Sequence, residues 1–287
     1  MSSLSNKIDF VLLITATNAN PNGDPLNGNR PRDNYDGYGE ISDVCIKRKI
    51  RNRLQDMGEN IFVQSDDRRT DDCDSLRSRA DACEALKKIA SGKKTNREKY
   101  AETACAEWID VRSFGQVFAF KGAEGMSVGV RGPVSVHQAM SVSPVDIVSM
   151  QITKSVNSDG KEWKSSDTMG MKHRVEFGLY MVKGSINCQL AEKTGFSDED
   201  AEKIKQALCT LFENDSSSAR PEGSMEVCRL YWWKHHCKTP SVPTAKVHRS
   251  LKVVEKDPGT KPRSFDDYLI TVEELSGGIV PEIIDLM

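Results

Sequence analysis

The chain has 287 residues, of which 29% are charged and 38% are hydrophobic, and its formal net charge is −2. These values are typical of a soluble globular protein with one or two domains. No apolar run is long enough to span a membrane, and the N-terminus MSSLSNKIDF lacks the apolar stretch of a secretory signal, so we expect a cytoplasmic protein without a membrane partner. A net charge near zero disfavours a simple nucleic-acid binder, so the local distribution of positive charge matters more than the net charge of the whole chain.

The first third of the chain predicts a strand, a long loop and a helix. Residues 8–17, IDFVLLITAT, are a near-continuous apolar and β-branched run, which predicts a buried strand. The loop that follows reaches about Glu40, and loops of this length inside a domain are usually functional. Ser42 is a good N-cap for an amphipathic helix over 43–57.

The rest of the chain predicts a mixed fold. We expect a short strand at 61–64, a helical insertion outside the central sheet at 65–108, and strands on both sides of Pro144. We also expect a projecting loop or hairpin at 157–173, strands at 175–191 and 225–237, and a helix at 197–214 that is capped by Ser197. The order strand, helix, strand, strand, helix, strand is the split βαβ arrangement of ferredoxin-like and RNA-recognition folds.

The long loop begins TNANPNGDPLNGNRPR and contains five Asn, three Pro and two Gly. Asn and Gly tolerate positive φ, and Pro fixes φ, so we expect a loop held in one shape with amide donors facing outward. Such a surface suits phosphate and ribose oxygens, and Arg30 and Arg32 would add charge-assisted contacts. A structural turn that covers a sheet edge is the alternative.

The predicted helix after this loop is unusually basic. Lys47, Arg48, Lys49, Arg51 and Arg53 occupy the circumference outside its apolar face, and no Glu stands four residues before them to pair with them. The pattern indicates a local positive surface in a slightly acidic protein. A solvated helix face without a binding role is the alternative.

Two further motifs contain candidate contacts. Met169 and Met171 flank a Gly beside Lys172 and His173, and a Met in a polar loop is useful if it wedges between bases. A surface Met pair without a role is the alternative. In DVRSFGQVF (110–118), Asp110 and Arg112 are expected to pair, and Phe114 would stack on a base or lie in the core.

Neither the cysteines nor the histidines indicate a metal site. The eight cysteines include no CxxC pair, so we expect reduced and mostly buried thiols. His235, His236 and Cys237, with Cys228 upstream, are the one hint of metal ligands, but ordinary zinc spacing is missing. We interpret them as a strand end and predict no metal and no cofactor.

Taken together, NANPNGDP, DVRSFG and MGMKHRVEFGLY with the following KGSINC resemble one family. The chain resembles the backbone subunit of the type I CRISPR interference complex (Cascade), a RAMP-type RNA-binding family, and most closely its type I-C form. The resemblance spans roughly residues 8–251. It implies an α+β fold with a modified ferredoxin-like or RRM palm at 1–64 and 109–287, a helical finger insertion at 65–108, and a β-hairpin thumb at about 156–174.

The resemblance implies a non-catalytic protein whose copies assemble head-to-tail along a guide RNA (crRNA) into a helical filament. Each thumb displaces one guide nucleotide while the guide pairs with target DNA. Further partners would be the other Cascade subunits and a recruited helicase-nuclease. By position, the RNA path is bordered by Asn18, Asn20 and Asn22, and Arg30 and Arg32 of the same loop would add contacts to it. Guide phosphates would be bound by Lys47, Lys49 and Arg51, and the guide would lie over Ser113, Phe114 and Gly115. The thumb would contain Met169, Met171, Lys172 and His173.

Two other functions compete with this one. Related type III backbone subunits cut target RNA with a loop Asp, and Asp24, Asp33 or Asp36 would serve here, with His137 or His173 as acid or base. A self-assembling structural protein without nucleic acid is the third hypothesis. For the head-to-tail contact we expect an acidic face to meet a basic one, with the pairs Asp66–Asp67 and Lys87–Lys88 as candidates.

Overall fold

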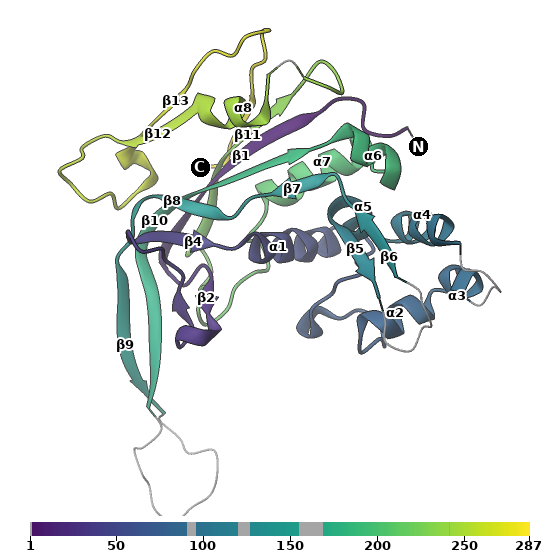
Figure 1. Ribbon diagram of the computed structural model, residues 1–287. Helices are drawn as coiled ribbons and strands as arrows, with labels where there is room; N and C mark the ends of the chain where they lie inside the picture. The colour runs from purple at the N-terminus through teal and green to yellow at the C-terminus, as the bar shows by residue number, and fades with distance from the viewer. Residues whose placement is uncertain (1, 91–95, 120–126, 155–168, 241) are drawn as a thin grey trace, which may run out of the picture.

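The computed structural model describes residues 2–90, 96–119, 127–154, 169–240 and 242–287 (Figure 1). The strands are β1 Ile8–Ala19, β2 Gly23–Asp24, β3 Arg30–Pro31, β4 Tyr38–Ile41, β5 Gly115–Phe118, β6 Val128–Arg131, β7 Val134–Val136, β8 Ala139–Pro144, β9 Ile147–Thr153, β10 Met169–Ile186, β11 Met225–Lys234, β12 Leu251–Glu255, β13 Tyr268–Val272 and β14 Glu282–Asp285. The α-helices are α1 Asp43–Asp56, α2 Leu76–Ala82, α3 Glu84–Ala90, α4 Arg97–Glu107, α5 Ile109–Phe114, α6 Cys188–Thr194, α7 Asp198–Cys209 and α8 Thr244–Ser250, and the 3₁₀ helices are η1 Pro25–Asn27, η2 Asp66–Arg68 and η3 Phe265–Asp267.

A mixed architecture with a central antiparallel sheet confirms the predicted fold class. The sheet runs in the order β14-β11-β1-β10-β8-β4, and β7 and β9 also pair with β10. The two middle strands, β1 and β10, pair antiparallel from Ile8↔Ile186 to Ala19↔Val175. The four strands of the predicted split βαβ order therefore lie as β11-β1-β10-β8, with α1 and α7 as the two crossover helices.

Strand β1 is apolar along most of its length because both faces of the sheet are covered. Its side chains Phe10 and Leu12 belong to a core beneath α1 and α7, whereas Val11 and Leu13 belong to a second core beneath α8, β12 and β13. Figure 1 shows these two layers on opposite sides of the sheet. A strand buried on both faces reads as a continuous hydrophobic run, which is how the sequence predicted it.

Both helices that cover the first face begin where their caps predicted. The Ser42 side chain accepts from the backbone N–H of Cys45 at 3.3 Å, at the start of α1. At α7, Ser197 and Asp200 form a reciprocal capping box, with Asp200 N–H to Ser197 Oγ at 3.1 Å and Ser197 N–H to Asp200 Oδ2 at 3.0 Å. No helix in the described part of the chain is long and apolar enough to cross a bilayer.

Two predicted strands are wrong in whole or in part. Residues 61–64 form no strand, because the N–H groups of Phe62 and Val63 bond to the Asp110 carboxylate at 2.7 and 3.0 Å instead of to a neighbouring strand. The strand predicted at 175–191 ends at Ile186, because the Asn187 side chain caps α6 by accepting from the N–H of Leu190 at 2.9 Å.

The helices α2, α3 and α4 pack around a small core of their own, which contains Phe62, Leu86 and Tyr100. That core also includes Phe118 and Val128, so it continues into the β5–β6 hairpin beyond the predicted insertion. The domain limits drawn from the sequence stay a prediction.

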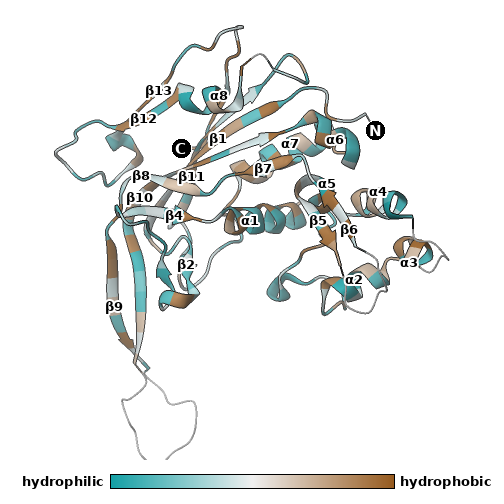
Figure 2. Ribbon diagram, in the orientation of Figure 1, coloured by the Kyte–Doolittle hydropathy of each residue, from teal (hydrophilic) through white to brown (hydrophobic). Residues whose placement is uncertain are grey.

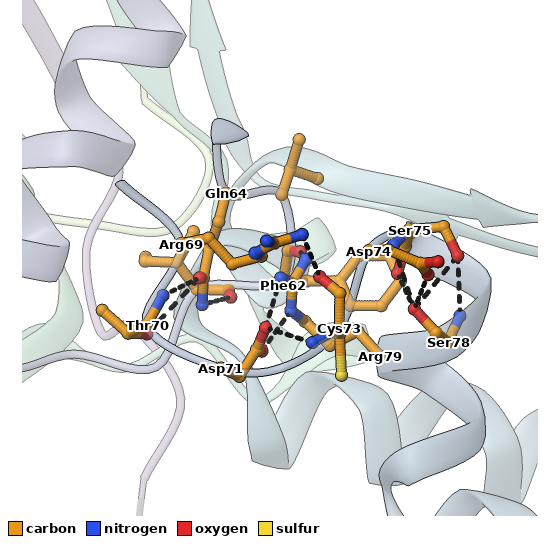
Figure 3. A network of polar contacts seen from close by, with 12 residues as sticks. Phe62, Gln64, Arg69, Thr70, Asp71, Cys73, Asp74, Ser75, Ser78 and Arg79 are labelled. Carbon is orange, nitrogen blue, oxygen red and sulfur yellow. Dashed lines mark hydrogen bonds and ion pairs between the residues drawn. The ribbon is translucent and has the colours of Figure 1, made fainter. Parts of the chain in front are cut away.

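A polar network fixes the segment that leads into α2 (Figure 3). The Arg79 guanidinium donates to both carboxylate oxygens of Asp71, at 2.6 and 2.8 Å, and to the Phe62 carbonyl at 2.8 Å. One bidentate guanidinium therefore ties the segment to the small core without regular secondary structure.

A two-stranded arm leaves the sheet where β10 extends past β1. In this arm β9 and β10 pair from Ile147↔Val175 to Thr153↔Met169. The arm therefore begins at Ile147, earlier than the predicted thumb, and the predicted thumb residues 155–168 lie outside the described residues. Figure 1 shows the arm and the helices α2–α4 projecting from the same side of the sheet, with α1 between them.

Candidate nucleic-acid interface

The loop between β1 and β4 is held in one shape by its Asn side chains. The Asn20 amide donates to the Asn29 carbonyl at 2.6 Å, and the Asn22 carbonyl oxygen accepts from the N–H of Ser42 at 2.9 Å. Asn20 is buried, so the expectation that its amide faces outward is wrong. A long loop must satisfy its own backbone groups, and these side chains do so. Asn18 is exposed at the end of β1.

The two Arg side chains of the loop have different partners. Arg32 pairs with Asp24 at 3.3 Å inside the loop, whereas Arg30 donates to Ser149 of the arm at 3.3 Å. Ser149 is also bonded to the His173 ring at 2.8 Å. A polar contact therefore joins the Asn-rich loop to the arm, although the two lie far apart in the sequence.

The rigid loop presents its apolar side chains to solvent. Leu26 in η1 is 98% exposed, and Tyr35 is also fully exposed. The backbone N–H of Leu26 bonds to Asp24 Oδ1 at 3.2 Å, which fixes the turn that carries this side chain. Two exposed apolar side chains on a preorganised loop are suited to contact a base or a partner protein.

The basic face of α1 is mostly paired, which corrects the sequence interpretation. Lys49 is buried and forms an ion pair with Asp215, Arg51 pairs with Asp110 at 3.0 Å, and Lys47 pairs with Asp43 at 2.9 Å. The last of these partners is an Asp four residues upstream, which a search for Glu overlooks. The other two come from distant segments, so the spacing within the helix contained no sign of them.

A cavity of about 310 Å³ lies against α1 and contains two cations that the sequence did not single out, Arg68 and Arg220. Arg48 of α1 lines it together with Arg220 and Arg68, and the loop after α7 closes it at Asn214 and Asp215. The lining holds four cations, the fourth being Lys49, against the two carboxylates of Asp67 and Asp215. The cavity is therefore locally positive in a chain of net negative charge, and that is the chemistry a phosphate requires.

The DVRSFG motif is largely internal. Asp110 and Arg112 do not pair, since residues two apart on a helix face different ways. Asp110 binds Arg51, and Arg112 makes a bidentate contact with Asp200 at 2.8 and 2.9 Å. Ser113 is fully buried, so the expectation that it lies under a guide is wrong in this arrangement.

The last two residues of that motif also have structural surroundings. Phe114 packs against the main core, and the Arg51 guanidinium lies 4.9 Å from its ring centroid. Gly115 has φ +83° at the junction of α5 and β5, a conformation that glycine adopts most readily.

The arm has two chemically distinct faces because strand side chains alternate. Met169, Met171 and His173 share the face that includes Ser149, which is the face bonded to the loop. Lys172 lies on the other face, opposite Met150 in the ladder. Met169 is 62% exposed and Met171 is 54% exposed. Figure 2 shows further hydrophobic residues along β9, outside the cores.

One loop carboxylate, Asp24, and several histidines have structural partners of their own. Asp24 binds Arg32 and caps η1, and His137 stacks edge-on against His248 at 5.6 Å between ring centroids. His235 is buried and donates to Asp9 at 2.7 Å. In the described part of the chain, no group of three or more His, Cys, Asp or Glu residues is arranged to hold a metal ion.

Comparison with known proteins agrees with this geometry. A chain of a CRISPR RNA-guided surveillance complex, pre-nicking, shares the fold with a TM-score of 0.50 and 14% identity, over 82% of this chain and 80% of that chain. A CRISPR-associated protein Cas7 of Haloferax volcanii is 26% identical over 255 residues, which cover 79% of this chain and 69% of the relative. The family model for CRISPR-associated protein Cas7 matches residues 6–273, nearly the whole chain. The protein therefore belongs to the Cas7 family.

Proposed function

We propose that this chain is a non-catalytic crRNA-binding subunit. Copies oligomerise head-to-tail along the guide to form the helical backbone of a type I-C surveillance complex that pairs with target DNA. The other Cascade subunits and a recruited helicase-nuclease are its further partners. The observation that carries the proposal is the arm and the helical segment α2–α4 projecting on either side of α1, with a cationic cavity on α1 between them.

In this proposal the guide is bound through its backbone. Arg48 and Arg220 provide the charge at the cavity on α1, and Lys47 lies on the same helix at 25% side-chain exposure. Lys49 acts indirectly, since its ion pair with Asp215 positions a wall of the cavity, and Arg51 holds α1 against α5 through its ion pair with Asp110. Contacts of this kind bind any sequence, and base pairing with the guide then selects the target.

The arm and the loop supply apolar contacts beside that path. Met169 and Met171 lie on the face of the arm that contacts the loop, and the loop presents Leu26. A guide RNA that passes over α1 would therefore contact both the arm and the loop. An apolar side chain inserted at a base step unstacks it, which accounts for the displaced guide nucleotide that the family resemblance implies. The fingers at 65–108 and the thumb at about 156–174 keep their assignment as proposals.

The decisive experiment is to purify the oligomer from cells and analyse its nucleic acid. We expect raised absorbance at 260 nm and, after extraction, RNA of discrete length. Arg48→Ala combined with Arg220→Ala should weaken RNA binding for every sequence and flatten the dependence of log K on log salt by roughly 0.7 per lost phosphate contact. Lys234→Ala combined with Lys238→Ala, at the far end of β11, is the matched control and should leave that slope unchanged.

Two results would contradict the proposal. An oligomer free of polynucleotide would leave a purely structural protein. Regular cleavage of complementary RNA by the purified complex with Mg²⁺ would instead favour an endoribonuclease of the type III kind, acting through Asp24, Asp33 or Asp36.

A further inference from the structure

A second cavity lies at the point where the arm leaves the sheet, on the face opposite α1. Its volume is about 250 Å³. The end of β1 and the middle of β10 form one wall, and the segment before η3 forms the other. Thr17, Asn18, Glu176, Phe177, Arg263 and Tyr268 are among its lining residues. Thr17 and Phe177 are partners in the β1–β10 ladder, on the side of the sheet that also holds Val11 and Leu179.

Asn18 has a left-handed backbone conformation at this cavity. Its φ is +52°, which Asn adopts more readily than most side chains, as Asn29 and Asn214 also do here. The conformation interrupts β1 between the ladder pairs Thr17↔Phe177 and Ala19↔Val175. Asn18 therefore lines a different site from Asn20 and Asn22, with which the sequence grouped it.

Two charged side chains at the cavity have no partner within the described ranges. Glu176 and Arg263 make neither a side-chain hydrogen bond nor an ion pair there, and the Asn18 amide is likewise unbonded. The neighbouring charges Asp146 and Lys261 do pair with each other. The backbone N–H of Glu176 bonds to the Asp146 carbonyl at 3.0 Å, which fixes the position of this residue.

We propose that this cavity binds one unstacked nucleotide of a single strand, at a site separate from the guide path on α1. The inference rests on the proposed function. The partly buried Phe177 ring supplies a stacking surface, and the amide of Asn18, which has both a donor and an acceptor, faces the base edge. Arg263 meets the phosphate in a charge-assisted contact.

An extended peptide fits the site poorly. The backbone N–H groups of Thr17 and Glu176 are already bonded there, to the Ser224 and Asp146 carbonyls at 2.8 and 3.0 Å, so they are not available to pair with an added strand. The nucleotide has two potential sources, the guide RNA or a second strand such as DNA, and both present the same chemistry.

The test uses the purified assembly with its co-purified nucleic acid. A fluorescein-labelled DNA of twelve thymidines is titrated by anisotropy, and the assembly is irradiated at 254 nm with and without it before peptide mass spectrometry. We expect a nucleotide adduct on the peptide that contains Phe177. Asn18→Gly, which keeps the left-handed backbone, and Arg263→Ala should each weaken DNA binding about tenfold, whereas Lys252→Ala, a cation on β12, should not.

The outcomes separate the two sources and the two proposals. Weaker DNA binding with unchanged RNA content assigns the nucleotide to a second strand, and a fall in RNA content with an RNA adduct assigns it to the guide. RNA present, with no adduct on that peptide and no effect of either variant, would overturn the site. An assembly without any RNA would instead refute the proposed function, and the DNA titration would still decide whether the cavity binds a nucleotide.

Discussion

At the scale of single residues, the polar side chains that the sequence marked as binding groups mostly hold the protein together. Asn20 and Asn22 fix the loop from inside, and Lys49 is buried against Asp215. A polar or charged side chain that is buried needs a partner, and these residues have found theirs at distant points of the chain. Arg48 and Arg220 line the cavity in the same region and are partly exposed, although Arg220 also pairs with Asp215 at 3.1 Å.

The Asp9 carboxylate contributes stability that depends on pH. It is fully buried and accepts hydrogen bonds from His235 and Lys7. Burial by itself raises the pKa of Asp9, but the His235 hydrogen bond and the Lys7 charge outweigh it, so the pKa lies below its ordinary value of 3.8. The stabilisation is therefore present above pH 3.8 and is lost as the pH falls through the lower folded-state pKa.

Asp9→Asn should lower the free energy of unfolding by about 3 kcal/mol at pH 7, because Lys7 loses its buried counter-charge. Urea unfolding at pH 7 and near pH 2 is the measurement, and the difference from the natural chain should shrink at the lower pH. Asp257→Asn, at an exposed turn carboxylate, is the control. An equal loss in the free energy of unfolding at both pH values would show that the charge of Asp9 does not stabilise the protein.

At the scale of elements, Gly115 determines whether α5 and β5 can join. A Cβ at this position would lie 2.3 Å from the Val130 carbonyl oxygen and 2.8 Å from the Gly132 nitrogen, both of which are backbone atoms. These atoms belong to the partner strand β6 and the residue just after it. The glycine of the DVRSFG motif is therefore explained by backbone geometry without reference to a ligand.

Gly115→Ala should destabilise the protein by about 2 kcal/mol more than Gly195→Ala. Gly195 has a left-handed helical backbone, which costs a side chain about 1 kcal/mol, and nothing lies within 4 Å of a Cβ there. Gly115 has φ +83° and ψ +167°, a region nearly restricted to glycine, so the additional loss comes from its backbone conformation together with the steric clash. Urea midpoints of the two variants provide the comparison, and equal midpoints would refute the steric explanation.

The arm offers a matched pair of variants, one for each of its faces. Met169→Ala with Met171→Ala should leave guide loading intact and impair pairing with complementary DNA, because the wedge at the base step is lost. Met150→Ala with Ile152→Ala removes exposed apolar side chains from the opposite face and should change neither property. R-loop formation measured by gel shift distinguishes them, and normal pairing by the first variant would exclude a wedge.

The sequence predicted the elements better than it predicted the site. The apolar run of β1, the Ser42 and Ser197 caps and the split βαβ order are local signals, and the structure confirms them. The full set of cations at the cavity was not predictable in this way, since Arg68 and Arg220 are brought to α1 only by the fold. The strand expected at 61–64 was wrong for the same reason, because the distant Asp110 carboxylate accepts hydrogen bonds from the N–H groups of this segment.

At the scale of the whole molecule, the near-zero net charge is consistent with an assembly in which an acidic face of one copy contacts a basic face of the next. We propose that the acidic pair Asp66–Asp67 of one copy meets Lys87–Lys88 of the next, in a heterologous contact that yields an open filament. Lys87 is 64% exposed at its side chain, and Asp66 and Asp67 stand on the surface helix η2.

Charge reversal tests this contact. Lys87→Glu with Lys88→Glu should shorten the filament, and so should Asp66→Lys with Asp67→Lys, because like charges then face each other. All four changes in one chain should restore its length, since opposite charges meet again. Filament lengths from electron micrographs are the measurement, and lengths that stay unchanged in both double variants would exclude these faces.

The central position of β1 has a consequence for synthesis on the ribosome. This strand is made well before its two ladder neighbours, which begin at Met169 and Met225. At translation rates of roughly 5–20 residues per second, the nascent strand waits on the order of ten seconds for its first partner. During that interval both apolar faces of the strand are exposed, so we expect chaperones to bind it. A messenger truncated before the codon of Met169 should yield a fragment that aggregates.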